Sequence, residues 1–379
     1  MEGSKVTPLV SEASSNSNFH KKPRLGSENT HNAQRTIRMK TTPYKAAVGA
    51  LFFAVVASVL SPAVAQDAAT KKDGLDKFLN MDAKDVETKL TVVQHEIYQL
   101  AVATAIVRFN QQYGHRVNLE SVEFASGLEL IPGYVFTPKE LVKGKRYPAI
   151  VWIHGGFHDR FDKYYFKLLD EAVSRGFVVI FPEYRGSAGY GEPHFQNSYG
   201  STDVADSLAS ADFIAKLPYV DPDRIGVAGH SRGGMVTLLA VQRQPKKFKA
   251  AVKIAGLVDF VAYMAYKPEY RRLEIAKEAQ FGGLLPDKNL GAYMKVSPVN
   301  FVNQIQTPLL VISNTLDKSV PIDLHTTRLV ELLRSYGKTH ETKIYKDAPG
   351  GHMFLFADTD EAKDTLKRTF DFFEKYLKP

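Results

Sequence analysis

Short apolar runs alternate with longer segments of helical periodicity along most of the chain after residue 118. Short apolar runs bounded by turn residues are typical of buried strands, and apolar positions at helical spacing are typical of covering helices. The alternation predicts an α/β domain over residues 119–379, with a mostly parallel, eight-stranded sheet flanked by helices. The predicted strands are Val122–Phe124, Glu129–Phe136, Ala149–Ile153, Val178–Phe181, Ile225–Ala228, Ala251–Ile254, Leu309–Ile312 and Thr342–Tyr345.

The segment that follows the sixth predicted strand departs from this alternation. Residues 258–296 are rich in tyrosine and charged residues and contain several helix formers. We therefore expect a small cap insertion over one end of the sheet. The helices that flank the sheet are predicted at Lys163–Ser174, Val204–Lys216, Gly234–Arg243, Asp323–Ser335 and Glu361–Tyr376.

The residues ahead of the α/β domain predict a helical arm. Between Asp67 and Gln112 the apolar positions lie near helical spacing. They include Leu90, Val93, Ile97, Leu100, Val102 and Ile106. We assign the arm to residues 66–118.

The pattern of residues 39–65 is that of a secretory signal peptide. Lys40 and Lys45 give a positive start, Ala46–Leu60 is apolar, and Ala63-Val64-Ala65 is a small-x-small cleavage site. The sequence predicts cleavage between Ala65 and Gln66, a secreted or periplasmic protein, and no stable membrane span after cleavage. An uncleaved anchor is the alternative, although the apolar run is short for a span.

Residues 1–38 are polar and contain few large apolar side chains. Such a segment buries too little surface to offset its ordering entropy, so we expect a disordered extension. Because Met39 opens the leader pattern, the alternative is that translation starts there and residues 1–38 are a misassigned start.

Composition narrows the possible chemistry. The formal net charge of +8 over 379 residues is modest and comes in part from the first 45 residues, so we predict no nucleic-acid partner. The chain has no cysteine, which excludes disulfides, thiolate metal sites and a cysteine nucleophile. We find no metal, nucleotide or flavin motif and therefore expect no cofactor.

A glycine-flanked serine carries the strongest chemical signal. Gly229-His230-Ser231-Arg232-Gly233-Gly234 follows the predicted strand Ile225–Ala228 and precedes an apolar helix. This strand–turn–helix context is that of the nucleophile elbow of α/β hydrolases, in which glycines let the backbone turn sharply under the serine. We predict that Ser231 is the nucleophile of an α/β-hydrolase fold.

A serine nucleophile needs a base and a carboxylate that orients the base. Three histidines follow Ser231, and only His352 lies in a glycine-rich turn between the last strand and the last helix; His325 and His340 are expected to be surface residues. Asp317 follows the strand Leu309–Ile312, at a strand's carboxyl end, where α/β sheets place their sites. Asp323 is the alternative acid, but it is better placed to cap a helix.

The developing oxyanion requires preorganised donors. One donor is predicted to be the backbone N–H of Arg232, and the other that of Gly155 or Gly156, in a glycine turn after a strand. His154 precedes these glycines and is a further candidate for the substrate pocket or, alternatively, a structural residue. Aromatic residues of the cap are the remaining pocket candidates, namely Tyr263, Tyr266 and Tyr293.

Several motifs in register closely resemble the catalytic domain of prolyl oligopeptidase family serine peptidases. The likeness extends over about residues 120–379 and rests on Tyr184–Gly191, Asp203, Asp221–Ile225, the Ser231 elbow, Tyr293, Ser297-Pro298, Asp317, Val320-Pro321 and His352. The resemblance implies a serine-type peptidase that works through an acyl-enzyme, with Ser231, Asp317 and His352 in the roles given above. We expect Arg185 and Asp203 to be structural partners. Many family members carry a large β-propeller, whereas only about fifty residues lie here between leader and hydrolase domain.

Three functions are compatible with these residues. The first is hydrolysis of peptide or aminoacyl amide bonds, with a peptide or a small ester or amide as substrate. The second is a carboxylesterase of the same fold, because the same machinery cleaves esters. The third is a non-catalytic exported binding protein that retains the fold, against which the intact Ser231, Asp317 and His352 set argues.

Overall fold

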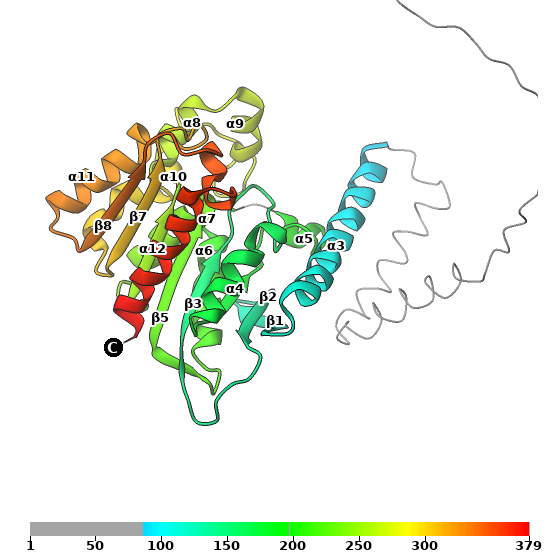
Figure 1. Ribbon diagram of the computed structural model, residues 1–379. Helices are drawn as coiled ribbons and strands as arrows, with labels where there is room; N and C mark the ends of the chain where they lie inside the picture. The colour runs from blue at the N-terminus through cyan, green and yellow to red at the C-terminus, as the bar shows by residue number, and fades with distance from the viewer. Residues whose placement is uncertain (1–85, 197, 379) are drawn as a thin grey trace, which may run out of the picture. The chain divides into compact units, whose positions relative to one another are not determined.

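The computed structural model describes residues 86–196 and 198–378, which lie in the compact unit Lys72–Pro379 (Figure 1). The predicted extension 1–38, the leader 39–65 and the first part of the arm lie outside the described residues.

One eight-stranded sheet forms the centre of the domain, in the order β1-β2-β4-β3-β5-β6-β7-β8. Strand β2 pairs antiparallel with both β1 and β4. The remaining neighbours, in the order β4-β3-β5-β6-β7-β8, all pair in parallel. This topology confirms the predicted α/β-hydrolase class. The strands are β1 Val117–Ser126, β2 Glu129–Pro138, β3 Tyr147–Ile153, β4 Val178–Pro182, β5 Val220–His230, β6 Ala250–Ile254, β7 Leu309–Asn314 and β8 His340–Tyr345.

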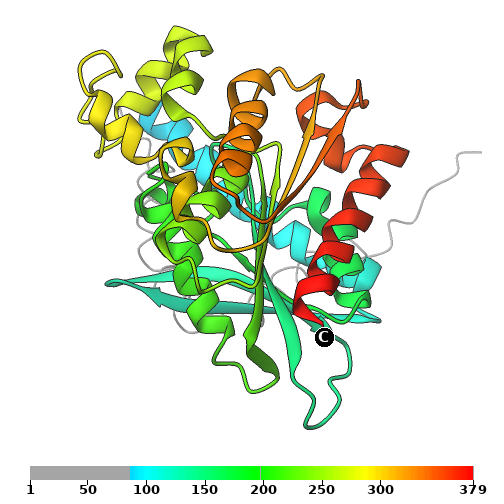
Figure 2. The same cartoon turned by 90° about the vertical axis from the view of Figure 1, so that its left-hand side faces the viewer.

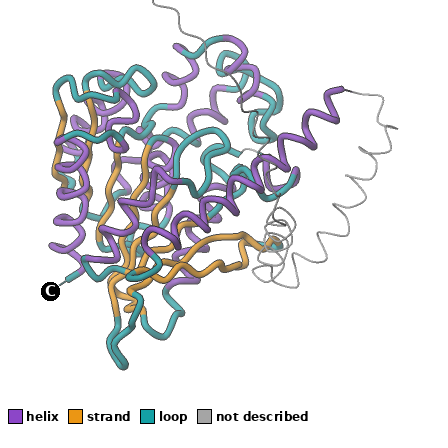
Figure 3. The backbone as a smooth tube through the Cα atoms, turned by 45° about the vertical axis from the view of Figure 1, so that its right-hand side comes forward, coloured by secondary structure: helices purple, strands orange, loops and turns teal. Residues whose placement is uncertain are grey.

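Helices cover both faces of the sheet, as Figures 2 and 3 show. The helices α6 and α7 pack on one face, while α4 and α12 pack on the other. The buried strand β3 shows why: Ile150 and Trp152 enter one core, and Val151 enters the other. Strands buried on both faces are typical of parallel sheets covered by helices.

The described helices agree with the predicted ones within a few residues, apart from the short α5 and the three helices of the cap. Their bounds are α3 Val86–Tyr113, α4 Phe166–Ser174, α5 Glu192–Phe195, α6 Thr202–Ile214, α7 Arg232–Arg243, α8 Phe260–Tyr266, α9 Glu269–Ala276, α10 Leu290–Lys295, α11 Arg328–Ser335 and α12 Asp360–Leu377. The predicted helix at Asp323–Ser335 starts with the π-helical turn Asp323–Thr327. Asp323 is its first residue, and Ile322 occupies the cap position for which we expected Asp323.

Helix α3 lies within the predicted arm and packs against the domain through Phe109. This fully buried ring contacts Phe136, Phe161 and Phe166 at centroid distances of 5.1, 5.9 and 5.2 Å. The outer face of α3 is also apolar and exposes Leu90, Val93, Ile97, Leu100 and Val107. Among the described helices, its segment Lys89–Tyr113 is long and apolar enough to span a membrane, judged by length and composition alone.

The aromatic contacts of Phe109 generate a prediction about stability. Phe109→Ala should lower the free energy of unfolding by about 3–5 kcal/mol, because it leaves a cavity among three buried rings. Val107→Ala is the matched control, since Val107 lies on the exposed face of the same helix. Its effect should stay within about 0.5 kcal/mol in urea denaturation. Equal effects of the two substitutions would contradict the docking of α3 through Phe109.

Candidate active site

Ser231 lies at a sharp turn between β5 and α7. Its backbone φ of 59° and ψ of −119° are strained for a residue with a side chain. Two glycines permit the turn: a Cβ on Gly229 would lie 2.3 Å from the backbone of Gly233, and one on Gly233 would lie 2.1 Å from the carbonyl oxygen of Ile153. The two glycines therefore determine the position of Ser231, because residues with a Cβ would not fit at these two places.

The structure brings Ser231, His352 and Asp317 into one hydrogen-bonded line. The Nε2 atom of His352 lies 2.9 Å from Ser231 Oγ, and its Nδ1 atom lies 2.8 Å from Asp317 Oδ2. His352 belongs to the 3₁₀ segment Gly351–Phe356 after β8, and Asp317 to the loop after β7. The Asp317 side chain is fully buried, whereas that of His352 is 16% exposed, on the side where a substrate would enter.

Backbone amides fix the carboxylate of Asp317. Its second oxygen, Oδ1, accepts hydrogen bonds from the N–H groups of Ser319 and Val320 at 2.9 and 2.8 Å. Both oxygens are thus engaged, one by the peptide chain and one by the histidine ring. The alternative acid, Asp323, is exposed and makes no such contact with His352.

Asn314, which we did not predict, ties the acid loop to the histidine loop. This fully buried side chain donates to the carbonyl oxygens of Ala348 and Gly351 at 2.9 and 3.0 Å and accepts from the N–H of Ala348 at 3.0 Å. The last residue of β7 therefore positions the residue that precedes His352. An asparagine at a strand end carries no distinctive sequence signal.

His230 makes a second contact with the histidine loop. Its Nε2–H donates to the carbonyl oxygen of His352 at 2.8 Å. Burial lowers the pKa of His230 to about 3, so the ring is neutral and fixed as this donor. The residue before the serine thus contributes to the position of His352.

The side chain of Arg232 anchors the first turn of α7. It is 1% exposed, its Nε donates to Asp203 Oδ2 at 2.9 Å, and its guanidinium lies 3.8 Å from the ring centroid of Tyr199. Our pairing of Arg185 with Asp203 is wrong, because Asp203 pairs with Arg232. Arg185 pairs instead with Asp206, one turn further along α6, at 2.7 Å.

The glycines after β3 lie beside the serine. An added Cβ on Gly155 would approach the Cβ of Ser231 at 3.1 Å, and Gly156 adopts a positive φ of 70°. The N–H of Gly155 points to the hydroxyl of Tyr165 at 3.4 Å. His154 is fully buried and turns away, with Nε2 2.8 Å from Ser187 Oγ, so the prediction that it lines the substrate pocket is wrong.

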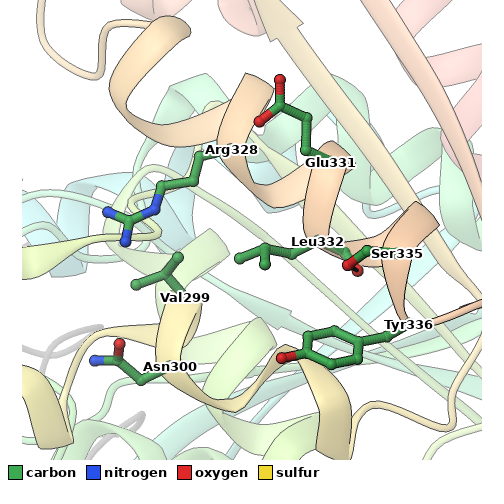
Figure 4. A pocket seen from close by; sticks show the side chains of 7 residues that line it. All are labelled: Val299, Asn300, Arg328, Glu331, Leu332, Ser335 and Tyr336. Carbon is green, nitrogen blue, oxygen red and sulfur yellow. Dashed lines mark hydrogen bonds between the residues drawn. The ribbon is translucent and has the colours of Figure 1, made fainter.

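A pocket of about 310 Å³ opens at Ser231 and His352. The cap supplies five of its eleven lining residues, including the predicted Tyr263. The full lining is Phe157, Ser231, Leu257, Tyr263, Lys267, Pro268, Tyr270, Arg271, Ser319, Val320 and His352. A larger hollow of about 570 Å³ lies between α11 and the segment after α10 and contains none of the three aligned residues (Figure 4).

Two of the predicted pocket tyrosines serve the scaffold instead. Tyr293 is fully buried, donates to the carbonyl oxygen of Leu284 at 2.8 Å and stacks on Phe281 at 4.1 Å, so its prediction as a lining residue is wrong. Tyr266 lies behind the pocket wall, where its hydroxyl donates to the carbonyl oxygen of Ser319 at 3.0 Å. It therefore supports the acid loop from below.

His325 is buried under the acid loop, which corrects its prediction as a surface residue. Its Nδ1 accepts from the N–H groups of Val258 and Asp259 at 3.2 and 3.3 Å, and its Nε2 lies 2.9 Å from the hydroxyl of Tyr266. Burial lowers its pKa to about 3, which keeps the ring neutral. His340 is partly exposed at the start of β8, where its Nδ1 lies 2.8 Å from the carbonyl oxygen of Lys338.

These features define an α/β hydrolase with a serine at its elbow, and comparisons with known proteins specify the family. The model of the prolyl oligopeptidase family matches residues 161–379, more than half of the chain. The chain belongs to the prolyl oligopeptidase family.

Curated relatives share the catalytic part of the chain. An uncharacterized peptidase of Bacillus subtilis (strain 168) is 28% identical, with 67% of this chain and 38% of the relative covered. The acylamino-acid-releasing enzyme of Arabidopsis thaliana is 31% identical, with 50% of this chain and 26% of the relative covered. The match therefore spans well under half the length of these relatives.

A solved structure gives the same result for the fold. The acylaminoacyl peptidase of Pyrococcus horikoshii superposes with a TM-score of 0.62 at 26% identity. The match covers 71% of this chain and 44% of that protein. The shared part again corresponds to less than half of the known protein.

The pairing of Arg232 with Asp203 generates a second prediction. Asp203→Ala should cost about 3–5 kcal/mol of unfolding free energy, because it leaves the Arg232 guanidinium buried without its carboxylate. Labelling of Ser231 by a fluorophosphonate should slow as well. Asp212→Ala is the control on the same helix: the Asp212 side chain is 60% exposed in its pair with Lys247. Its loss should cost less than about 1 kcal/mol in the same denaturation experiment.

The buried neutral ring of His325 generates a third prediction. The unfolded chain takes up a proton on this histidine below its ordinary pKa of 6.5, whereas the folded chain does so only near 3, so acidification favours unfolding. The stability advantage of the wild type over His325→Gln should therefore shrink by up to about 1.4 kcal/mol per pH unit as the pH falls. Urea denaturation between about pH 7 and pH 4 measures it. His340→Gln is the control, and an advantage that grew on acidification would contradict the prediction.

Proposed function

We propose that this chain hydrolyses peptide or aminoacyl amide bonds through an acyl-enzyme formed on Ser231, with His352 as base and Asp317 as its orienting acid. The observation that supports the proposal most directly is the line of hydrogen bonds of 2.9 and 2.8 Å through the two ring nitrogens of His352. Membership of the prolyl oligopeptidase family gives independent support.

The first half-reaction transfers the acyl group to the serine. Ser231 Oγ attacks the carbonyl carbon of the scissile bond while His352 Nε2 takes the hydroxyl proton. The carboxylate of Asp317 accepts the Nδ1–H bond and stabilises the imidazolium that forms. His352 then passes the proton to the leaving nitrogen, the C–N bond breaks and the amine departs.

Water completes the cycle by the same route. His352 takes a proton from the water, whose oxygen attacks the ester carbonyl of the acyl-enzyme, and returns a proton to Ser231 Oγ as the ester bond breaks. This step releases the carboxylic acid product and restores the free serine, so the atoms of the reaction balance without a cofactor.

Two backbone N–H groups would stabilise the oxyanion in both half-reactions. The first is the N–H of Arg232, which is the first residue of α7 and directly follows the nucleophile. The ion pair with Asp203 and the contact with the ring of Tyr199 hold this residue in place. For the second donor we favour Gly156 over Gly155, because the N–H of Gly155 already points to Tyr165. Each such donor contributes on the order of a hundredfold or more to turnover.

Substitutions of the acid test the proposal. Asp317→Asn should lower kcat by as much as about ten-thousandfold, through loss of the correct tautomer and of imidazolium stabilisation. Asp323→Asn is the matched control and should remain within a few-fold of wild type. Release of p-nitroaniline from N-acetyl-alanyl-p-nitroanilide by the full chain measures both.

A loss of the nucleophile completes this test. Ser231→Ala should abolish turnover, by about a millionfold, while circular dichroism shows an unchanged fold. Ester turnover without any amide turnover would favour the carboxylesterase. A wild-type chain that fails to react with a fluorophosphonate would favour a binding protein.

A further inference from the structure

Cationic side chains line the pocket beside Ser231. Among the side chains of the described residues that form its wall, Lys267 and Arg271 carry a positive charge, and none is a carboxylate. Asp317 lies behind His352, with its side chain fully buried and both oxygens already bonded. A substrate that enters the 310 Å³ pocket therefore meets positive charge in the same pocket that Ser231 and His352 line.

Lys267 is held in the wall by neutral groups. It directly follows the last residue of α8, and its Nζ donates to the carbonyl oxygen of Ser319 at 3.1 Å. The ammonium lies 4.5 Å from the ring centroid of Tyr263 and 5.1 Å from that of Tyr266. Ring faces and a carbonyl orient a cation but leave its charge uncompensated. An ammonium has three donors, of which Ser319 uses one.

The second cation differs in its surroundings. The guanidinium of Arg271 lies 4.0 Å from the ring centroid of Phe157 and pairs with the partly exposed Glu274 one turn further along α9. Glu274 offsets part of its charge. Lys267 is therefore the group in this wall whose charge is available to a ligand.

Because Lys267 is partly buried, its ammonium has lost part of its solvation and a bound anion would stabilise its charge. Desolvation lowers the pKa of its ammonium, while the nearby carboxylate of Asp317 raises it. A ligand carboxylate in the pocket would act in the same direction as Asp317 and favour the charged form. By the same physics, a substrate ammonium at this place would meet repulsion and a lost solvation shell.

We propose that Lys267 is a specificity residue that binds a carboxylate of the substrate, so that the enzyme prefers peptides with an anionic group next to the scissile bond. The inference rests on the proposed hydrolase function and names its substrate class. The carboxylate has two possible sources: an acidic side chain in the acyl part, or the free α-carboxylate of the leaving part.

Two pairs of amides, matched in size, distinguish the two sources. The first pair is N-acetyl-glutamyl-p-nitroanilide and N-acetyl-glutaminyl-p-nitroanilide, which differ in the charge of the acyl part. The second pair is N-acetyl-alanyl-alanine and its C-terminal amide, which differ in the charge of the leaving part. We expect the full chain to prefer the anionic member of one pair by about tenfold or more in kcat/KM, mainly through KM.

Substitution of Lys267 tests which residue causes the preference. Lys267→Met keeps the length of the stem but removes the charge, so the preference for the anionic member in kcat/KM should vanish. Lys267→Arg should restore most of it. Lys277→Met is the matched control, because Lys277 is exposed at the end of α9 in the same cap and does not line the pocket. It should leave both ratios unchanged.

The outcomes separate this inference from the proposed function. Equal rates on both members of both pairs, or a preference that survives in a folded Lys267→Met variant, would overturn the inference. Labelling of Ser231 by a fluorophosphonate reports folding of each variant, and Lys267→Gln replaces the methionine variant if that one fails to fold. If no amide is cleaved, the peptidase proposal fails, and p-nitrophenyl esters of N-acetyl-glutamate (α-ester) and N-acetyl-glutamine still measure the charge preference.

Discussion

The close approach of backbone around Ser231 is the constraint on which the rest of the site depends. The first turn of α7 contacts the end of β5 and the end of β3 so tightly that a methyl group on Gly229 or Gly233 would overlap main-chain atoms. The serine takes up the resulting strain in its backbone angles. Interactions elsewhere must maintain this geometry, since strained conformations persist only where their surroundings over-determine them.

The surroundings meet this demand with buried polar contacts. On one side, Asp203 and Tyr199 hold the Arg232 side chain, which fixes the first residue of α7. On the other side, Asn314 and His230 hold the carbonyl and amide groups of the loop that carries His352. Each of these groups is buried and bonded, so a displacement would leave unsatisfied donors or acceptors at a cost of about 1–3 kcal/mol each.

The acid loop is supported from below by a third set of polar residues. The hydroxyl of Tyr266 contacts the loop at Ser319, and His325 contacts that hydroxyl in turn. The buried Lys253 lies 2.8 Å from Thr326 Oγ1 and 3.3 Å from Ser313 Oγ. Burial lowers the pKa of Lys253 to about 7. A group whose charge is this costly is placed where the carboxylate of Asp317 offsets part of the desolvation.

The sequence predicts most of the fold, because strand burial and helix amphipathicity are local patterns; all eight strands appear where the apolar runs place them. The serine and its glycines are also local, and His352 and Asp317 follow from chain order. The partners of Arg232, the burial of His325 and the inward turn of His154 could not be predicted in this way. Each of these features depends on contacts between side chains that are distant in the sequence. The sequence does not show whether a charged or polar residue is solvated or paired with such a partner.

The cap is a second place where the sequence does not show which side chains are paired or buried, and here the difference affects the substrate pocket. We predicted three tyrosines of the cap to line the pocket, yet Tyr293 packs in the core, Tyr266 supports the acid loop and Tyr263 alone of the three lines the wall. Tyr270, which we did not predict, lines the pocket as well. Tyr263 and Tyr266 lie on α8 and Tyr293 on α10, so the tertiary course of these short helices decides which of them meets the pocket. The chain from the end of α8 into α9 also brings Lys267 and Arg271 to the pocket. The proposed catalytic residues belong to the sheet and its loops, whereas the positive charge of the pocket comes from the cap. A change in the cap can therefore alter which substrate binds without disturbing the strained turn at Ser231.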